Sequence, residues 1–352
     1  MNDLAKRKLR GSVATLKSET ATWDVHRQDW EPPRFFTVTT FRQDGVISTS
    51  DMHNPDGSVV HSRRLYDSSG RMTEFDSWMN DQAPLRVLYF YDDAGRHIRT
   101  AQVRDDGTQT DLETCTYDSN GKGTKTRLLP LSPLAERDGG AVSLGYSMEE
   151  TDMVLGAPGA AFMTTTYAAE SQPAKVLLED QNHQAIREVD FKRDASGRLL
   201  NVETHMGDSQ IKDLADRMSP EARERATAVL KEIFGKSLSR ATYRYDALGR
   251  LAERTDSMGT MSEEHKTFRY DGVHEEAIEE ITEREIREAS VEDDGAIRYN
   301  PDTVSTQRTR FHYSYDTHGN WTEQLISVQY GPDAEFQCSS MERRAITYYT
   351  AD

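Results

Sequence analysis

Cysteine is scarce in this sequence, and long apolar runs are missing. Only Cys115 and Cys338 occur among 352 residues, and neither has a second cysteine or a histidine at ligand spacing. That excludes a zinc centre and a disulfide framework, and it leaves one disulfide open. No apolar stretch could span a bilayer, and the start, MNDLAKRKLRGSV, lacks the apolar run of a signal peptide. We expect a protein that is cytoplasmic as written, or extracellular if its leader is absent or it is exported by another route.

Positive charge is the next deficit. The chain has 43 Lys and Arg against 60 Asp and Glu, a formal net charge of -17. Binding to nucleic acid or to an anionic membrane depends on basic side chains that neutralise phosphates. We therefore expect no nucleic acid and no membrane insertion. An acidic surface could attract a basic partner, or it could simply keep the protein soluble.

Motifs that carry chemistry are also missing. The ten histidines form no HExxH or His-x-His cluster, and no G-x-S-x-G, Walker A or dinucleotide-binding pattern stands in a strand-to-helix context. Aspartate recurs in similar turns, whereas a catalytic pair of carboxylates needs two different environments. We predict no catalytic residues, no metal site, no cofactor and no enzymatic activity.

What the chain does contain is a repeated motif, Tyr-Asp-x-x-Gly-Arg, most complete in the stretch YRYDALGR. Its aspartates are residues 67, 92, 118, 194, 246, 271 and 316, and most of the steps between them are close to multiples of about 25 residues. Further turn signals, such as RDDGT and DSMGT, lie about halfway between copies. A unit of that length is two strands and two turns, which predicts an antiparallel meander.

Most residues of the motif have a structural explanation. Aspartate at the start of a turn can accept hydrogen bonds from backbone N–H groups, and the glycine supplies the positive φ where the turn closes into a bulge. The tyrosine is a strand residue able to pair across the hairpin, and the arginine has no assigned role. The predicted structural turn residues are Tyr66, Asp67, Gly70, Arg71, Tyr91, Asp92, Gly95, Arg96, Tyr117, Asp118, Gly121, Asp194, Gly197, Arg198, Tyr245, Asp246, Gly249, Arg250, Tyr270, Asp271, Tyr315, Asp316 and Gly319.

Two segments interrupt the repeat. Residues 129–165 are rich in Gly, Pro and small side chains, which predicts an irregular insertion. Residues 211–236 contain Ser219 and Pro220 before the run EARERATAVLKEIF, followed by Gly235. An N-cap, a proline at the first helical position and a terminal glycine predict an inserted α-helix.

The motif resembles that of the bacterial YD-repeat, or Rhs-repeat, proteins. The segment from Tyr243 to Leu251 fits best, whereas Arg193 replaces the tyrosine of one copy and His318-Gly319-Asn320-Trp321 replaces the Gly-Arg-Leu ending of the last. The resemblance implies a long β-sheet that winds on itself, and it carries over no protease or toxin activity. We predict an all-β fold: a single domain over residues 1–352, a long curved antiparallel β-meander of YD-repeat hairpins with one inserted α-helix.

Binding is the function class that these observations favour. The prediction is a non-catalytic YD-repeat scaffold for protein or carbohydrate interaction, which the resemblance associates with secretion or polymorphic-toxin systems. Two alternatives are a polysaccharide hydrolase with a site formed by residues 129–165, and a partial shell or chaperone for a basic partner. Exposed tryptophan can stack on a sugar ring or anchor a protein, although it also packs on a covered sheet face. The candidate ligand contacts are Trp23, Trp30, Trp78 and Trp321.

Overall fold

The computed structural model is almost entirely β-structure. It describes residues 2–33, 35–119, 122–128, 160–169, 172–207, 211–212, 216, 223, 237–258, 262–272, 274–286, 289–291, 297–299 and 303–350. The one helix that it bounds among them is the short α1 (Asp3–Lys6). No helix in these ranges is long and apolar enough to cross a membrane.

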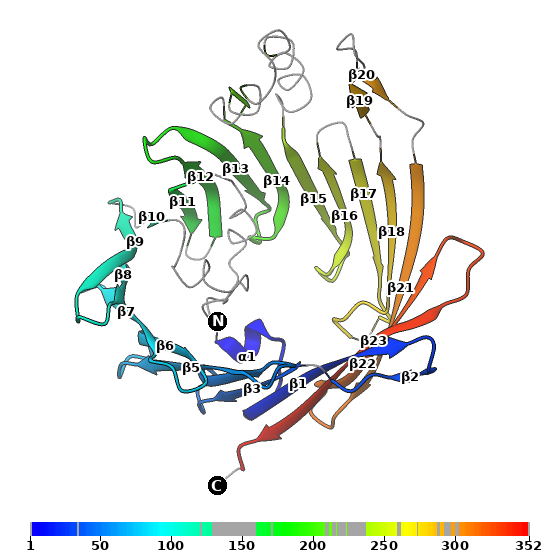
Figure 1. The fold of residues 1–352 in the computed structure, drawn as a ribbon, viewed down its shortest axis with the longest axis horizontal. Helices are drawn as coiled ribbons and strands as arrows, with labels where there is room; N and C mark the ends of the chain where they lie inside the picture. Colours follow the sequence, from blue (N-terminus) through cyan, green and yellow to red (C-terminus); the bar gives the residue numbers. More distant parts are fainter. Residues whose placement is uncertain are drawn as a thin grey trace. The chain divides into compact units, whose positions relative to one another are not determined.

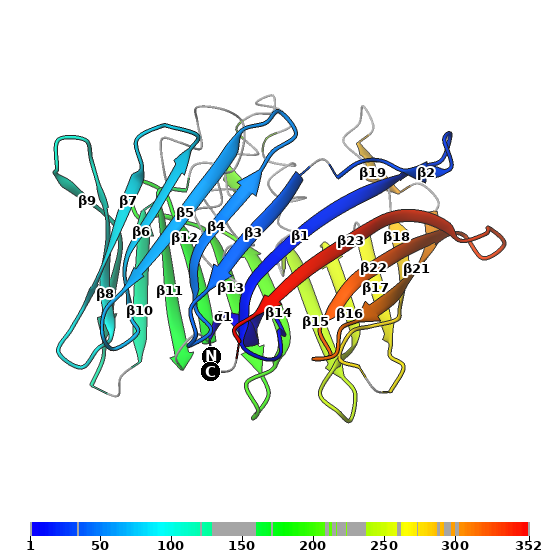
Figure 2. The same cartoon turned by 90° about the horizontal axis from the view of Figure 1, so that it is seen from below.

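Antiparallel pairing joins the strands into one sheet of 21 strands. Strand β1 (Val13–Asp24) pairs with β3 (Phe35–Phe41) on one side and with β23 (Gln337–Tyr348) on the other (Figure 2). The ladder therefore returns to its first strand, with the pairing of a closed 20-strand β-barrel, while β2 (Asp29–Trp30) pairs with the end of β1. The predicted open meander is wrong, because the first and last strands satisfy each other's backbone groups instead of leaving free edges.

By its contacts the chain divides into two compact units, and the first contains residues 1–110, 270–279 and 308–352. Its core is a cluster around α1, where Leu4 and Leu9 pack with Phe41 and Ile47 against the start of β1 (Figure 1). Its other complete strands are β4 (Ile47–His53), β5 (Val59–Tyr66), β6 (Met72–Met79), β7 (Leu85–Tyr91), β8 (His97–Val103) and β22 (Trp321–Tyr330).

The second unit contains residues 111–269 and 280–307. Its core is built from alternate residues of neighbouring strands, with Met163, Val176, Leu178 and Val189 at most 1% exposed. Its complete strands are β10 (Gly123–Leu128), β11 (Phe162–Ala169), β12 (Gln172–Glu179), β13 (Ala185–Arg193), β14 (Leu199–Met206), β15 (Ser239–Tyr245), β16 (Leu251–Met258), β17 (Ser262–Arg269), β19 (Ala289–Val291) and β20 (Ile297–Tyr299). Three strands have residues in both units: β9 (Gln109–Tyr117), β18 (Glu279–Ile286) and β21 (Thr303–Tyr315).

The two predicted insertions are described only in part. Of residues 129–165, those from 160 onward are described, and β11 begins among them; residues 129–159 lie outside the described ranges. Of the predicted helix at 211–236, residues 211, 212, 216 and 223 are described and have helical backbone.

The repeated turn places a β-bulge at the same point of the hairpins that contain Tyr66, Tyr91 and Tyr245. The strand register shifts between Leu65 and Tyr66 in one hairpin and between Arg244 and Tyr245 in another. The glycines of these turns, Gly70 and Gly249, have φ of +78° and +83°. A side chain is strained at such φ values, which explains why glycine occupies this position.

Candidate functional site

Within one copy of the repeat, the aspartate and arginine bind each other. Oδ1 of Asp67 accepts hydrogen bonds from the backbone N–H groups of Ser69 and Arg71, both at 2.9 Å. Nε of Arg71 donates to the other carboxylate oxygen at 2.7 Å. The backbone bond from Arg71, aided by its side chain, lowers the pKa of Asp67 below its ordinary value. The same pair of bonds recurs in the copies at Asp92 and Arg96, Asp194 and Arg198, and Asp246 and Arg250.

Arg71 and Arg198 also contact the tyrosine of the next copy, which is a role that sequence reasoning did not find. The guanidinium of Arg71 lies 5.0 Å from the ring centroid of Tyr91, and the Tyr91 hydroxyl donates to the carbonyl of Met72 at 2.7 Å. Tyr245 lies over Arg198 in the same way, at 4.8 Å, and donates to the carbonyl of Leu199 at 2.8 Å. The motif side chains are therefore engaged with one another, as a structural element requires.

The incomplete copies keep part of this arrangement. Asp118 accepts from the backbone N–H of Lys122 at 2.8 Å, while Gly121 lies outside the described residues and Tyr117 ends β9. In the shortened copy, Asp271 accepts from the backbone N–H and from Nδ1 of His274, at 2.9 and 2.6 Å, and Tyr270 directly precedes it, half-buried. The aspartate is therefore the constant part of the turn.

The last copy differs from the motif, and the residue that replaces its arginine connects the two ends of the chain. Asn320 stands in the place of the arginine and is 2% exposed. Its Oδ1 accepts from the backbone N–H of Arg10 at 2.6 Å, and its Nδ2 donates to the Arg10 carbonyl at 2.8 Å. Nδ2 also donates to the hydroxyl of Tyr348 at 2.7 Å. One amide side chain thus links the segment before β1 to the last strand.

The tyrosine of the last strand completes this junction. The Tyr348 hydroxyl donates to Asp316 Oδ2, the oxygen that an arginine occupies in the other copies. Burial and this bond raise the pKa of Tyr348 to about 12. His318 stacks on the Tyr348 ring with centroids 3.9 Å apart, and Gly319 has φ of +77°. Tyr315 begins this turn and stacks on the His274 ring at 4.2 Å.

The four candidate tryptophans are all half-buried and have different surroundings. Trp78 stacks on His61 with centroids 5.2 Å apart. Trp321 lies under the guanidinium of Arg344, which is 3.3 Å from its ring centroid, so packing explains both of these residues. Trp23 and Trp30 meet edge to face at 5.1 Å, where β1 pairs with β2.

Trp30 lines a small hollow of about 210 Å³ on the first unit. Pro32, Pro33 and Met341 line its apolar part together with Trp30, beside the buried Ala21. Sequence reasoning missed the partners of Trp30 in this hollow, because Met341 is about three hundred residues away along the chain and reaches it through the pairing of β1 with β23. We name these four residues the Trp30 hollow.

Charged residues that are already paired border the Trp30 hollow. Glu19 lies 3.0 Å from the ammonium of Lys17, and Arg343 donates to Glu323 at 3.1 Å. Glu19 and Arg343 also line a neighbouring hollow of about 370 Å³. Glu31 also lines the Trp30 hollow, so the rim offers carboxylate acceptors and a guanidinium donor.

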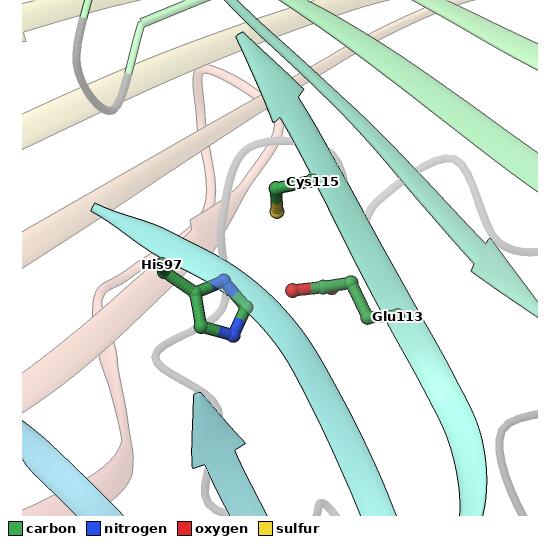
Figure 3. Close-up of side chains that lie close together, drawn as sticks. All are labelled: His97, Glu113 and Cys115. Carbon is green, nitrogen blue, oxygen red and sulfur yellow. The ribbon is translucent and has the colours of Figure 1, made fainter. Parts of the chain in front are cut away.

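Two potential metal ligands of the second unit lie on β9. Glu113 and Cys115 project from the same face of this strand (Figure 3). Glu113 is 5% exposed and accepts from Nε of the buried Arg127 at 3.1 Å. His97, drawn in the same figure, belongs to the first unit, where its Nε2 lies 2.8 Å from the Thr100 hydroxyl. A buried ion pair accounts for Glu113, and we assign no metal site here.

Both cysteines of the chain are thiols, so the single disulfide that the sequence left open is not formed. Cys115 is half-buried and Cys338 is exposed. The hydrolase site predicted on residues 129–165 falls mainly on residues 129–159, outside the described residues.

Comparison with known proteins finds no match among family models and none among curated proteins. Solved structures do match. A porin-like protein from Bacteroides uniformis is 10% identical with a TM-score of 0.34, over 95% of this chain and 96% of its own. A porin-like protein from Bacteroides vulgatus is 11% identical with a TM-score of 0.28, over 79% of this chain and 98% of its own. We infer no function from similarity at this level.

These comparisons correct two expectations. Both structures are described as porin-like proteins, which conflicts with the prediction of a cytoplasmic protein without membrane insertion. The expectation of an open YD-repeat, or Rhs-repeat, sheet conflicts with the closed strand pairing and with the porin-like description of these neighbours. Membership of that family stays a prediction that rests on the motifs alone.

Proposed function

We propose that the chain is a non-catalytic scaffold that binds a carbohydrate or protein partner, with the Trp30 hollow as its contact site. The observation that carries this proposal is the mutual engagement of the repeated Asp, Arg and Tyr side chains, shown by Arg71 and its bonds to Asp67 and Tyr91. Side chains that bind one another in copy after copy support a structural role for the repeat. Binding is then assigned to surface features outside it.

The chemistry of the Trp30 hollow favours a carbohydrate over a protein. Trp30 packs edge to face with Trp23, so its orientation is set before a ligand arrives. Aromatic rings stack on the apolar faces of sugars, and the paired Glu19 and Arg343 could exchange hydrogen bonds with hydroxyl groups. A volume of about 210 Å³ is small for a hydrophobic protein anchor cluster.

The test compares two tryptophan variants on a glycan array. We expect the intact chain to bind a neutral glycan and Trp30→Ala to lose at least about tenfold in affinity, the usual effect of removing a central aromatic contact. Trp78→Ala is the matched control, because Trp78 packs on His61 away from the hollow. Equal binding by Trp30→Ala and the intact chain would refute the assignment.

A parallel pull-down separates the other partner classes. A protein captured by the intact chain and lost with Trp30→Ala, together with an empty array, would assign the hollow to a protein. A protein whose capture is lost at high salt but is unaffected by Trp30→Ala would instead indicate that a basic partner binds the acidic surface. No observation in the described residues favours the hydrolase, and the association with a secretion or toxin system stays a prediction from the resemblance.

A further inference from the structure

A third hollow on the first unit shares no lining residue with the Trp30 hollow. Its volume is about 560 Å³, within the range typical of sites for small molecules. Its apolar lining comes from Ile278, Phe311, Leu325 and Phe336, and its polar lining from Glu279, Arg310, His312 and Ser327. We name it the Phe336 hollow.

A buried glutamine fixes the loop that carries Phe336. Gln329, at the end of β22, is 8% exposed. Its Nε2 donates to the carbonyls of Pro332 and Ala334, at 3.3 and 2.5 Å. Two hydrogen bonds from one buried side chain hold the turn between β22 and β23, so the aromatic wall of the hollow is formed before a ligand arrives.

Arg310 lies over the ring of Phe336. Its guanidinium carbon is 3.9 Å from the ring centroid of Phe336, and its Nε donates to Glu279 at 3.3 Å. The Arg310 side chain is 58% exposed, and its two terminal nitrogens have no hydrogen-bond partner among the described residues. The two terminal N–H₂ groups of this exposed guanidinium are therefore available to a ligand.

The charges of the hollow indicate what kind of ligand fits. Glu279, which is 8% exposed, balances the charge of Arg310, so an anion would meet the buried carboxylate and a cation would meet the guanidinium. Apolar walls suit an aromatic body, a guanidinium stacks well on a planar ring, and its free N–H groups need an oxygen acceptor. We propose that the Phe336 hollow binds a small, uncharged, planar aromatic molecule that carries a carbonyl-type oxygen.

The test uses prodan, a neutral naphthyl ketone whose emission shifts to the blue in an apolar site. We expect saturable binding by the intact chain, displaced by acetylnaphthalene better than by naphthoate or by naphthylmethylamine. Arg310→Lys keeps a positive charge beside Glu279 but removes the planar guanidinium group. It should therefore raise the dissociation constant for prodan at least about fivefold. Ser327→Phe should fill the hollow and abolish binding while leaving Arg310 intact.

Two control variants separate this site from other surfaces. Arg308→Gln removes a charge from the same strand without touching the hollow and should bind prodan as the intact chain does. Trp30→Ala should also bind normally, so failure at this site and failure of the carbohydrate proposal are distinguishable. The proposal is overturned if the intact chain does not shift prodan emission, if Arg310→Lys and Ser327→Phe bind unchanged, or if naphthoate or naphthylmethylamine displaces prodan better than the neutral ketone does.

Discussion

Replacing Asn320 with alanine tests whether the junction of the chain ends stabilises the first unit. The change removes three side-chain hydrogen bonds: two to the backbone of Arg10, at 2.6 and 2.8 Å, and one to Tyr348 at 2.7 Å. Each such bond contributes about 0.5 to 1.5 kcal/mol, and the Arg10 backbone groups lose their partners in a poorly hydrated place. We expect the free energy of unfolding to fall by about 2 to 4 kcal/mol.

Hydrogen exchange with mass spectrometry measures this effect locally, because a chain with two units need not unfold in one step. In Asn320→Ala, amides of β1 and β23 should exchange faster, and those of β5 and β6 should change little. Asn54→Ala is the matched control, because its amide donates only to Ser58 within its own turn, at 3.0 Å. Unchanged exchange in β1 and β23 would refute the role of the junction.

Asn320→Arg gives the opposite test of the same reasoning, since it restores the residue of the motif. An arginine would need the space that Arg10 and Tyr348 occupy around a side chain only 2% exposed. We therefore expect the consensus residue to destabilise the protein at least as much as alanine does. A rise in stability would show that the motif, and not the junction, decides this position.

Three further predictions concern one repeat of the second unit and can be checked by urea denaturation. Gly249→Val should cost about 1 to 3 kcal/mol, because the backbone φ of +83° strains a branched side chain, while Gly249→Asn should cost less. Tyr245→Phe should cost about 0.5 to 1.5 kcal/mol, because it deletes the hydroxyl bond to the Leu199 carbonyl; an unchanged midpoint would mean that water replaces the bond. Burial raises the pKa of Asp246, but the hydrogen bonds and charge of Arg250 lower it more, so its net shift is downward. The stabilising effect of the Asp246 carboxylate is present above the unfolded pKa of about 3.9 and disappears as pH falls through the folded pKa. Asp246→Asn should therefore lose less stability than the intact chain when the pH is lowered below about 4. Identical pH profiles of the two proteins would contradict this.

The local parts of the structure could be predicted from the sequence because their hydrogen bonds span at most four residues. The aspartate, the glycine and the bulge of each hairpin form between neighbours in YRYDALGR, and the spacing of the copies predicts their order. The role of the arginine needed the structure. Its partner Tyr91 belongs to the next copy, and nothing in a single motif shows that Arg71 and Tyr91 meet.

The candidate sites were harder to predict for a similar reason. Trp30 was a candidate from its residue type, but Met341 and Arg343 reach it only through the pairing of β1 with β23. The Phe336 hollow had no sequence signal at all, because Arg310 and Phe336 lie on different hairpins and meet across the sheet. Pockets on a sheet depend on which strands become neighbours.

The sequence by itself determined that this protein is built of antiparallel hairpins with a tight Asp-x-x-Gly turn, since short-range bonds and alternating strand residues need no distant partner. Only the tertiary structure decided that the sheet closes. Closure depends on how twist and register add up over all the strands until β23 meets β1, a sum that no local pattern contains. The one trace of it in the sequence was an irregularity: Asn320 replaces the arginine of the motif where it binds Arg10.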